Sequence, residues 1–353
     1  MQPIKFMVIG CGQVFDKYWV PAHEKAQLVI SGIISKNDTQ QKHLNSGFPY
    51  HPTDSTKNTI EILMNTSDSY GAIALLVPAD VRLELLTAIL SQPKLQTKKV
   101  FIEKPYTKDL SQIKEFKNLI KKYPGRLHFS GKYSYGRADN LIQILSKTDD
   151  LPLFINAVMI EGSKYFNKVM DNQNTDLYFK DGPELDLGFH ILNISAMYLN
   201  SKEDKIRTIL INKNTVMDLN CIRPYFLPNL GFVAEVVFTL NSRRTVPLYL
   251  QVGKADCISN RHIDFDFKDK RIVQYFTTLD ASDPVYEVRE DTRELLAKHK
   301  PGYLYYSKEL SPEAFCKQTT YEQEIDMEIN RICMQIKDIR EGSCKDVVES
   351  IAG

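Results

Sequence analysis

From residue 4 to about residue 130, the chain alternates short apolar runs with longer amphipathic segments, and this alternation constrains the fold most. The runs are rich in β-branched residues and have polar flanks, as buried parallel strands do. The segments between them repeat apolar residues at helical spacing. The alternation predicts βαβ units and a doubly wound α/β sheet. The expected strands are Ile4–Ile9, Leu28–Ile34, Ala72–Val77, Val100–Ile102 and Leu127–Phe129, and the expected helices are Thr59–Asn65, Val81–Ser91 and Leu110–Lys122.

After about residue 150 the pattern changes to a run of strand-like segments with few helices between them. Such a run predicts a largely antiparallel sheet with one face toward solvent or a partner. One strong helix, Glu184–Leu199, interrupts the run, and an amphipathic segment, Tyr321–Arg340, lies near the end. The expected strands are Leu153–Ile160, Ile206–Ile211, Phe232–Leu240, Val246–Val252, His262–Phe267 and Arg271–Phe276.

Three parts of the chain follow from these patterns. We expect residues 1–130 to form an α/β nucleotide-binding domain. Residues 131–320 should form an α+β domain with a large, mostly antiparallel open sheet. Residues 321–353 should form a C-terminal helical segment that packs back on the first domain.

Charge and cysteine usage exclude several functional classes. The 353 residues include 45 basic and 44 acidic ones, and a formal net charge of +1 gives no general attraction to nucleic acid or to an anionic membrane. No apolar stretch approaches the ~20 residues that span a bilayer, and the first residues do not resemble a signal peptide. The six cysteines form no CxxC pair or Cys/His cluster. We therefore expect a cytoplasmic protein without a metal site or disulfide framework.

A Gly-Cys-Gly turn, Gly10–Gly12, follows the first expected strand where a helix should begin. The first glycine allows a tight turn, and the second lets the backbone approach a pyrophosphate. The helix N-terminus beyond it offers N–H groups to anionic oxygens. Phe15 replaces the usual third glycine, which implies looser helix–strand packing. The turn could be a plain strand-to-helix connection, but its place in the first βα unit favours a dinucleotide and a Rossmann domain.

The end of the second expected strand bears on the choice of dinucleotide. NAD-specific sites usually place an Asp or Glu about 20 residues beyond the glycine loop. Here the neutral Ser35 stands near that position and Lys36 follows it. A hydroxyl and an ammonium group can bind a 2′-phosphate that a carboxylate would repel. We therefore favour NADP(H); NAD(H) stays possible because Asp38 is close by, and Lys36 could instead be an incidental solvated lysine.

Lys104 lies in Glu103-Lys104-Pro105, just beyond the strand Val100–Ile102. Ligands of open α/β sheets bind at this edge. Pro105 biases Lys104 toward an extended conformation, which can aim its side chain. A lysine there can stabilise the alkoxide that develops on a substrate oxygen during hydride transfer. Such a tripeptide alone is usually a surface charge, so the prediction depends on the other motifs.

Asp186 and His190 open the strong helix of the second domain, within Gly182–His190. They are four residues apart and so share one helix face. The ordinary histidine pKa of about 6.5 suits proton exchange at neutral pH, and a carboxylate can orient the reacting group. An isolated Asp/His pair is more often an exposed helical pair than a catalytic one.

Together these segments resemble the glucose–fructose oxidoreductase / inositol dehydrogenase / MocA (Gfo/Idh/MocA) family. The glycine turn, the Glu-Lys-Pro after a strand and the G-x-x-x-D-x-G-x-H helix entrance occur in that family's order. Each motif is weak alone, but three in order are specific. Further resemblances lie in Trp19–Ala22, Leu76–Asp80, Gly131–Tyr133 and Glu324–Gly342, so that nearly the whole chain is covered.

The resemblance implies an NAD(P)-binding Rossmann domain, an open-sheet domain and an active site between them. It implies hydride transfer between nicotinamide and a hydroxyl or carbonyl carbon of a sugar, nucleotide sugar or polyol. His190 would take the hydroxyl proton, Lys104 would polarise the oxygen and Asp186 would orient the sugar or the base, although either Lys104 or His190 can be the proton acceptor. A homodimer or homotetramer through the open sheet is also implied. The expected cofactor-binding residues are Gly10, Gly12, Gln13, Val14, Ser35, Lys36, Pro78 and Glu103, and the substrate candidates are Tyr133 and Tyr165.

Two other functions fit the same motifs. One is a non-catalytic sensor or regulatory protein that binds the cofactor, and the other is a redox-neutral enzyme that recycles a tightly bound cofactor. The sequence also departs from the family at Phe15, Asp80 and Arg82. Arg82 could recognise an acidic substrate, but a solvated helix position is the simpler interpretation.

Overall fold

The computed structural model divides the chain into two compact units, each described here by itself. The first comprises Met1–Lys132 with Glu324–Ala352, and the second comprises Tyr133–Gln323 with Gly353. The structure describes residues 3–12, 14–25, 28–36, 47–104, 106, 112–130, 138–161, 187–214, 231–254, 260–276, 285–289, 329, 332, 333 and 336.

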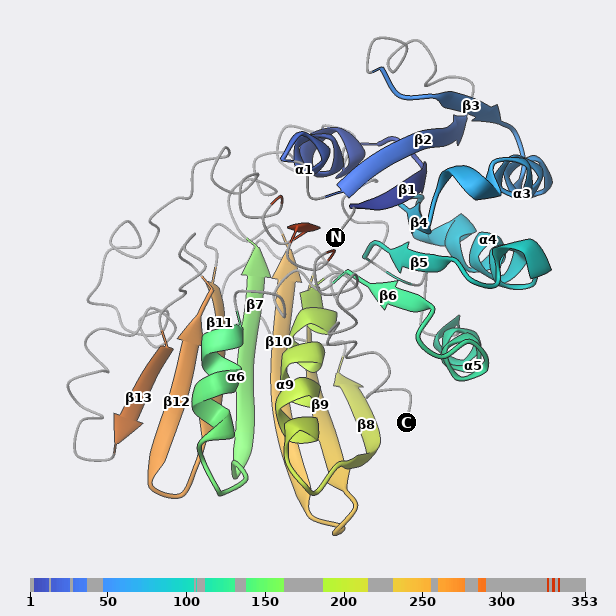
Figure 1. Cartoon of the computed structure of the whole chain (residues 1–353). Helices are drawn as coiled ribbons and strands as arrows, with labels where there is room; N and C mark the ends of the chain where they lie inside the picture. The colour runs from blue at the N-terminus through green and yellow to red at the C-terminus, as the bar shows by residue number, and fades with distance from the viewer. Residues whose placement is uncertain are drawn as a thin grey trace. The chain divides into compact units, whose positions relative to one another are not determined.

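The first unit contains a six-stranded parallel sheet with helices packed against it (Figure 1). Its strands are β1 (Ile4–Ile9), β2 (Leu28–Lys36), β3 (Tyr50–Thr53), β4 (Ala72–Leu75), β5 (Lys99–Ile102) and β6 (Leu127–Phe129). Their order is β3-β2-β1-β4-β5-β6, and every pair is parallel. This is the strand order of a dinucleotide-binding Rossmann sheet, so the predicted fold class is confirmed.

Helices connect these strands. The first connection begins as a π-helix, η1 (Phe15–Trp19), and continues as α1 (Val20–Glu24). The Ser55 hydroxyl starts α3 by accepting a hydrogen bond from Asn58 N at 3.2 Å, as an N-cap residue does. The remaining helices are α3 (Thr56–Asn65), η3 (Ser67–Ser69), α4 (Ala79–Leu90), η4 (Pro93–Leu95) and α5 (Ile113–Lys122).

The sheet has a hydrophobic core on each face. Phe6 and Val8 of β1 pack into one core cluster, while Met7 and Ile9 pack into the other, because successive side chains of a strand point to opposite faces. The cluster that holds Met7 and Ile9 takes side chains from α3, α4 and α5. The cluster that holds Phe6 and Val8 takes side chains from η1 and α1. Ile329, Ile332 and Ile336 are buried in the cluster of η1 and α1. The C-terminal segment therefore supplies core to the first unit.

The second unit contains a seven-stranded sheet with α6 (Asp139–Ser146) and α9 (Phe189–Ser201) on one face (Figure 1). Its strands are β7 (Phe154–Glu161), β8 (Ile206–Asn214), β9 (Gly231–Leu240), β10 (Thr245–Lys254), β11 (Asn260–Asp266), β12 (Lys270–Tyr275) and β13 (Val285–Arg289). Their order is β13-β12-β11-β7-β10-β9-β8. Only the β7–β10 pair among these is parallel. The predicted mostly antiparallel sheet is thus confirmed.

Several details differ from the expectations. The helix expected from Glu184 is described as α9 from Phe189, preceded by a π turn at Leu187 and Gly188, and residues 184–186 lie outside the described residues. Strands β3 and β13 and helix α6 were not predicted. β3 is an edge strand that contains Pro52, and proline obscures a strand pattern although it is tolerated at a sheet edge.

No helix among the described residues is long and apolar enough to cross a membrane. In the same part of the chain, no three His, Cys, Asp or Glu side chains gather as a metal ion would require.

Candidate active site

Backbone hydrogen bonds continue the ladder of the first sheet beyond the carboxyl ends of its strands. Each bond joins the first residue after one strand to a carbonyl near the end of the neighbouring strand. The loops after β1, β4, β5 and β6 therefore begin side by side at one edge, which is where ligands of open α/β sheets bind. The bonds are Gly10 N–H to Ile34 O (2.9 Å), Leu76 N–H to Ile9 O (2.9 Å), Glu103 N–H to Leu75 O (3.2 Å) and Ser130 N–H to Ile102 O (2.9 Å).

The two glycines of the first loop meet different surroundings. Gly10 has a φ of +92°, and a Cβ placed there would lie 3.0 Å from the carbonyl carbon and oxygen of Leu76. This position needs glycine both for its backbone conformation and for the close approach of the loop after β4. A Cβ at Gly12 would have no neighbour within 4 Å. The space at Gly12 can therefore admit a ligand close to the backbone.

Phe15 fills space that the sequence predicted to be loosely packed. Its side chain is fully buried in the core cluster of η1 and α1, and its ring meets that of Phe48 at a centroid distance of 6.3 Å. The helix begins at Phe15 as a π-helix, a wider turn than an α-helix. The expectation of loose packing was wrong because the aromatic ring itself occupies the space beside the sheet.

The loop after β4 is held by a buried arginine. The Arg82 side chain is only 2% exposed, and its Nη2 donates to the carbonyl oxygen of Val77. The interpretation of Arg82 as a solvated residue was therefore wrong. Pro78, an expected cofactor-binding residue, is exposed and precedes α4 with a φ of −55°. Asp80 is exposed in the first turn of α4.

Ser35 and Lys36 lie at the carboxyl end of β2, where β3 pairs with them through Pro52 and Thr53. Ser35 is half-buried and Lys36 is exposed. The Tyr50 hydroxyl donates to Lys36 O at 2.6 Å, which fixes the backbone of the lysine and leaves its side chain toward solvent. These two residues are thus presented next to the glycine turn of β1, the neighbour of β2 in the sheet.

Lys104 is half-buried and directly follows Glu103, whose side chain is 5% exposed. The Glu103 Oε1 atom accepts two hydrogen bonds, from Lys104 N at 3.0 Å and from Ser130 Oγ at 2.9 Å. The Tyr106 hydroxyl donates to Ser130 O. These contacts attach the lysine-bearing loop of β5 to the end of β6.

His190 is the second residue of α9 and only 2% exposed, with its ring 5.9 Å from that of Phe189. His190 is therefore buried, unlike the histidine of an ordinary exposed helical pair. Val14 precedes η1 and is half-buried beside the core cluster of η1 and α1. Four expected site residues lie outside the described residues, namely Gln13, Tyr133, Tyr165 and Asp186.

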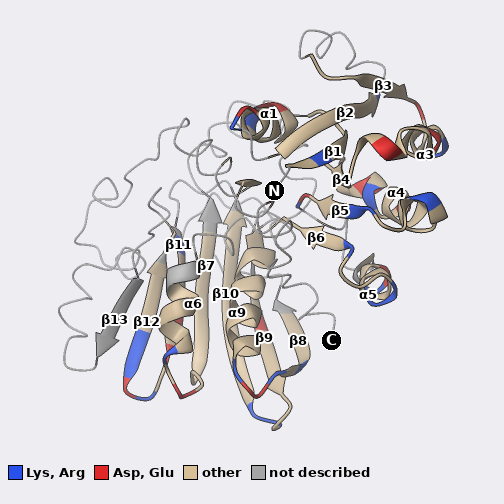
Figure 2. Cartoon of the chain, viewed as in Figure 1, with Lys and Arg blue, Asp and Glu red and all other residues tan. Residues whose placement is uncertain are grey.

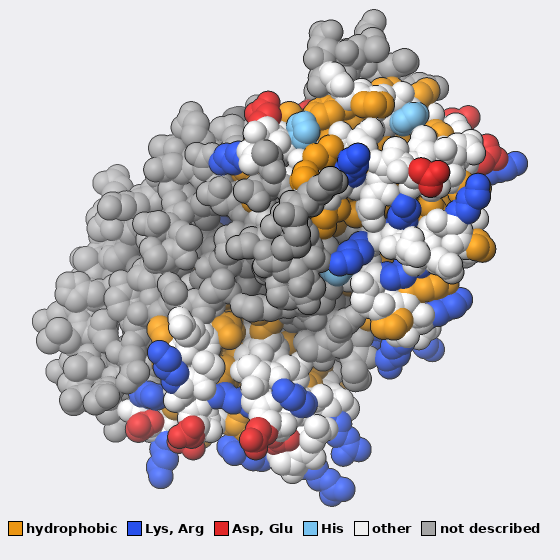
Figure 3. Space-filling model, viewed as in Figure 1, with side chains coloured by type: hydrophobic (Ala, Val, Ile, Leu, Met, Phe, Trp, Pro, Cys, Tyr) orange, Lys and Arg blue, Asp and Glu red, His pale blue; other side chains and the backbone are white. Residues whose placement is uncertain are grey.

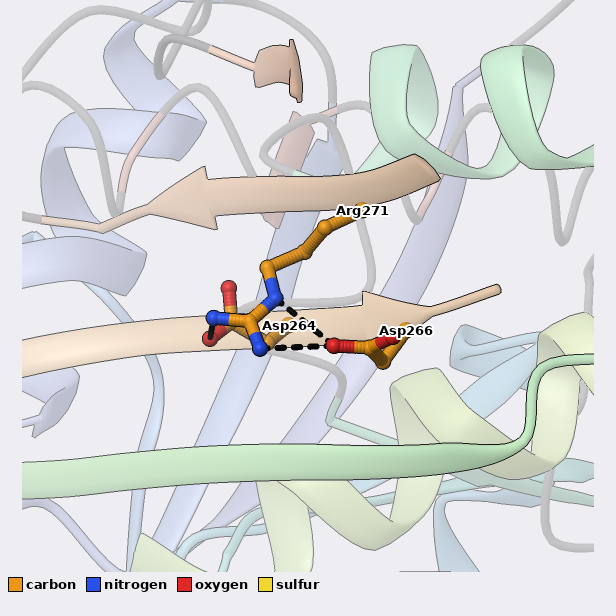
Figure 4. Close-up of polar contacts among 3 residues, drawn as sticks. All are labelled: Asp264, Asp266 and Arg271. Carbon is orange, nitrogen blue, oxygen red and sulfur yellow. Dashed lines mark hydrogen bonds and ion pairs between the residues drawn. The ribbon is translucent and has the colours of Figure 1, made fainter. Parts of the chain in front are cut away.

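A buried group of charges in the second unit was not predicted (Figure 4). The Arg271 guanidinium donates through Nε and Nη2 to one oxygen of Asp266, at 2.8 and 2.6 Å, and its Nη1 lies 3.8 Å from Asp264 Oδ2. Asp264 and Asp266 are 1% and 5% exposed, so the guanidinium offsets part of the cost of burying two carboxylates. Arg271 pairs with Asp266 across β11 and β12. We assign the group a structural role in fixing the register of these strands.

Charges on the described surface are mixed in sign. Figure 2 marks basic and acidic residues on the helices of the first unit and at the turns of the second sheet. On the described part of the face drawn in Figure 3, basic, acidic and hydrophobic side chains are interspersed. This distribution agrees with the formal net charge of +1.

Comparison with known families decides the identity of the first unit. Residues 4–130 match the family GFO_IDH_MocA, described as "Oxidoreductase family, NAD-binding Rossmann fold". These residues belong to the Gfo/Idh/MocA family. The resemblance inferred from the motifs is confirmed, and the chain carries the NAD-binding fold of an oxidoreductase family. No curated protein matches the chain in sequence.

Several solved structures share the fold of this chain over nearly its whole length. Myo-inositol 2-dehydrogenase from Lactobacillus plantarum is 11% identical, with a TM-score of 0.59 over 99% of this chain and 94% of that one. The 3-ketoreductase KijD10 from Actinomadura kijaniata, in complex with TDP-benzene and NADP, is 15% identical, with a TM-score of 0.58 over 99% and 94%. An oxidoreductase from Agrobacterium radiobacter, in complex with NAD+, L-tartaric acid and magnesium, is 14% identical, with a TM-score of 0.61 over 99% and 92%. At these identities the likeness shows the fold.

Sequence reasoning did not predict the contacts of three side chains that hold the loops at the carboxyl edge of the first sheet. Arg82 was noticed but misinterpreted, and Ser130 and Tyr106 gave no signal. Ser130 directly follows the expected strand Leu127–Phe129, and that position was the available clue, because polar residues just beyond parallel strands often reach the ligand edge.

Proposed function

We propose that this chain is an NAD(P)-dependent oxidoreductase that transfers hydride between nicotinamide and a hydroxyl or carbonyl carbon of a sugar, nucleotide sugar or polyol. One observation carries the proposal. The glycine turn, the loop after β4 and the lysine-bearing loop begin side by side at the carboxyl edge of a sheet with the Rossmann strand order.

The residues at this edge fit a dinucleotide. Gly10 permits the tight turn, and Gly12 has open space where a pyrophosphate would approach the backbone. The helical segment that begins at η1 follows directly, and its first N–H groups can bind anionic oxygens. When bound, the nicotinamide C4 supplies the acceptor or donor of the hydride.

The proposed roles of the side chains follow from their chemistry. Lys104 holds and polarises the reacting oxygen, because an ammonium group stabilises the negative charge that develops there. His190 exchanges the hydroxyl proton, and its burial keeps competing water away from the imidazole. Asp186 orients the sugar or the histidine. Tyr133 and Tyr165 are proposed substrate contacts.

We propose NADP(H) as the preferred dinucleotide. Ser35 and the exposed Lys36 stand at the end of β2 without an acidic residue at either position, and both can donate to a 2′-phosphate. Structures of similar fold contain either NADP or NAD+, so the preference rests on these two residues.

We further propose that copies of the chain associate through the face of the second sheet opposite α6 and α9. Tyr249 of β10 is 46% exposed on that face. Its neighbours Leu248 and Leu250 point to the opposite face, which carries the helices, and are buried. The Phe154 and Tyr249 rings pack together from adjacent strands at a centroid distance of 6.2 Å. An aromatic pair with one exposed ring on a sheet face favours a protein partner over solvent.

The test is turnover of sugars, nucleotide sugars and polyols with NADP(H) and NAD(H), followed by nicotinamide absorbance. With the substrate found, Lys104→Ala should lower kcat about 10²–10³-fold and His190→Ala about 10²–10⁴-fold. Lys57→Ala, which removes an exposed lysine of α3, is the matched control. Wild-type turnover by folded Lys104→Ala and His190→Ala variants would show that the mechanism is wrong.

The same assay separates the two other functions. Tight cofactor binding without hydride transfer across the panel would indicate a sensor. Substrate conversion with unchanged nicotinamide absorbance, in protein that purifies with its cofactor, would indicate a redox-neutral enzyme.

A further inference from the structure

Ser130 bonds to the lysine-bearing segment through each of its polar groups. Its N–H donates to Ile102 O at 2.9 Å and continues the β5–β6 ladder. Its hydroxyl donates to Glu103 Oε1 at 2.9 Å. Its carbonyl oxygen accepts from the Tyr106 hydroxyl. One residue beyond β6 therefore contacts residues 102, 103 and 106, on both sides of Lys104.

The bond to Glu103 reaches Lys104 through a shared atom. The same Oε1 that accepts from the Ser130 hydroxyl accepts from Lys104 N at 3.0 Å. Glu103 is 5% exposed and Ser130 is fully buried, so solvent cannot readily replace the Ser130 donor or reach the Glu103 acceptor. A carboxylate in such surroundings holds its donors firmly, because charge-assisted hydrogen bonds are roughly twice as strong as neutral ones. The orientation of the peptide group at Lys104 is thereby tied to Ser130.

Tyr106 supplies the second attachment, on the far side of Lys104. Its ring packs edge-on against Phe129 of β6 at a centroid distance of 4.8 Å. The hydroxyl then reaches the carbonyl oxygen of Ser130, the residue after Phe129. Ring packing and hydrogen bond act on the same strand end, so the loop is attached to β6 before and after the lysine.

We propose that Ser130 is a positioning residue for Lys104, acting through Glu103 and assisted by Tyr106. The catalytic use of this positioning rests on the proposed function of Lys104, but the positioning itself does not. A lysine side chain has four rotatable bonds, so its ammonium group is placed accurately only if its backbone is fixed. A displacement of about 1 Å can cost about 10²-fold in rate.

Two conservative variants remove the attachments one at a time. Ser130→Ala removes the hydroxyl and keeps both backbone bonds. Tyr106→Phe removes the hydroxyl and keeps the ring on Phe129. Ser91→Ala is the matched control, because the exposed Ser91 hydroxyl donates only locally, to Ala88 O at 2.9 Å. Tyr106→Phe also keeps the proposal testable if Ser130→Ala does not fold.

The primary measurement needs no substrate. Trace acetylation of the full-length protein with acetic anhydride over a pH series, read by peptide mass spectrometry, gives the reactivity of Lys104 relative to the exposed Lys57. We expect the Lys104 to Lys57 labelling ratio to differ from wild type about threefold or more in Ser130→Ala and in Tyr106→Phe. Ser91→Ala should match wild type. Loss of fold alone would change many lysines, whereas this proposal predicts a change centred on Lys104.

With a substrate in hand, the same variants should lower kcat about tenfold and leave the Kd of the dinucleotide within about twofold. Unchanged Lys104 labelling in both folded variants would overturn the positioning role. If labelling changes but Lys104→Ala keeps wild-type turnover, Ser130 still positions Lys104 and the proposed catalytic function is the part that fails.

Discussion

Two glycines only two residues apart have different duties at the proposed cofactor edge. Gly10 combines a φ of +92° with a backbone neighbour 3.0 Å from its would-be Cβ, whereas Gly12 has neither constraint. A glycine that the fold requires and a glycine that a ligand requires should respond differently to the same added methyl group.

Gly10→Ala and Gly12→Ala test this difference. We expect Gly10→Ala to lower the free energy of unfolding of the first unit by about 1–3 kcal/mol, because alanine is strained at positive φ. Gly12→Ala should change stability by less than about 0.5 kcal/mol but raise the Kd of the dinucleotide roughly tenfold, since the methyl group enters the space of the pyrophosphate. Urea unfolding and fluorescence titration measure the two effects. Equal losses of stability in both variants would contradict this division of roles.

Lys36 is the residue that tests the choice of dinucleotide. Its exposed ammonium group should pair with a 2′-phosphate, a partly screened contact that we expect to contribute about tenfold in affinity. Lys36→Ala should therefore raise the Kd for NADPH and leave that for NADH unchanged, as measured by titration of nicotinamide fluorescence at low salt. The control is Lys57→Ala. A parallel loss for both dinucleotides would mean that Lys36 does not recognise the 2′-phosphate.

At the scale of residues, the sequence predicted where a residue lies in a strand or turn better than it predicted the burial and contacts of its side chain. The turn at Gly10 and the place of Lys104 beyond β5 follow from local pattern, because strand ends and turns are encoded locally. The burial of Arg82 does not, since a guanidinium on a helix is normally solvated, whereas here it turns inward and donates to Val77 O. Asp186 lies outside the described residues, so its role stays a prediction.

At the scale of elements, α9 shows how polar groups join the helices of the second unit. The Lys202 ammonium group donates to Leu145 O and Thr148 O at the carboxyl end of α6, and lies over the Tyr198 ring at 5.2 Å. The Tyr198 hydroxyl donates to Asp150 O at 3.4 Å. Cations favour the C-terminus of a helix, so these contacts attach α9 to the end of α6.

Tyr198 gives this attachment a pH dependence. Burial raises the pKa of Tyr198 from 10.0 to about 12. Below pH 10 both folded and unfolded chains keep the phenol proton, and its stabilising effect is complete. Between these two values the unfolded chain loses the proton first, so the free energy of unfolding falls as pH rises, by on the order of 1–3 kcal/mol.

Tyr198→Phe should remove the fall in the free energy of unfolding above pH 10. The phenylalanine ring can keep the edge-on contact with Phe265, which has a centroid distance of 5.1 Å in the wild type. Urea unfolding of wild type and variant over this pH range measures the difference. Since the hydroxyl donates a hydrogen bond to Asp150 O, the variant should be less stable by about 1 kcal/mol at neutral pH and should approach wild type as pH rises. Identical pH profiles would show that Tyr198 titrates normally.

Helices and strands were predicted where the apolar residues show a strong periodicity. They were missed where an element forms only through its contacts with distant parts of the chain. All strands of the two sheets except β3 and β13 were predicted, with ends that differ by a few residues. β3 was missed because four residues with a central proline carry no alternating pattern, and it exists as a strand through its pairing with β2. The parallel β7–β10 pair was equally hidden, because strand direction depends on long-range connections.

At the scale of the whole molecule, the alternation of strand and helix in the sequence was enough to predict the Rossmann fold. The association of copies depends instead on which side chains the folded surface exposes. The second sheet carries helices on one face, and its other face holds the exposed Tyr249 next to Phe154. Val237 of the neighbouring strand β9 is half-buried, pairs with Pro247 and adds apolar area to that face. The proposed homodimer or homotetramer would cover this surface, and the cytoplasmic location inferred from the scattered cysteines stays a prediction.

Tyr249→Lys tests whether this face joins copies of the chain. An ammonium group buried in an apolar interface without a partner costs several kcal/mol, on the order of what breaking a buried pair costs, so the variant should shift to monomer at concentrations where wild type is oligomeric. Val81→Lys is the matched control, because Val81 is similarly exposed, at 45% against 46%, but lies on α4 of the first unit. Light scattering coupled to size-exclusion chromatography measures both, and unchanged circular dichroism shows that the sheet is intact. A monomeric wild type at micromolar concentration, or an oligomer that tolerates Tyr249→Lys, would mean that the open face serves another purpose.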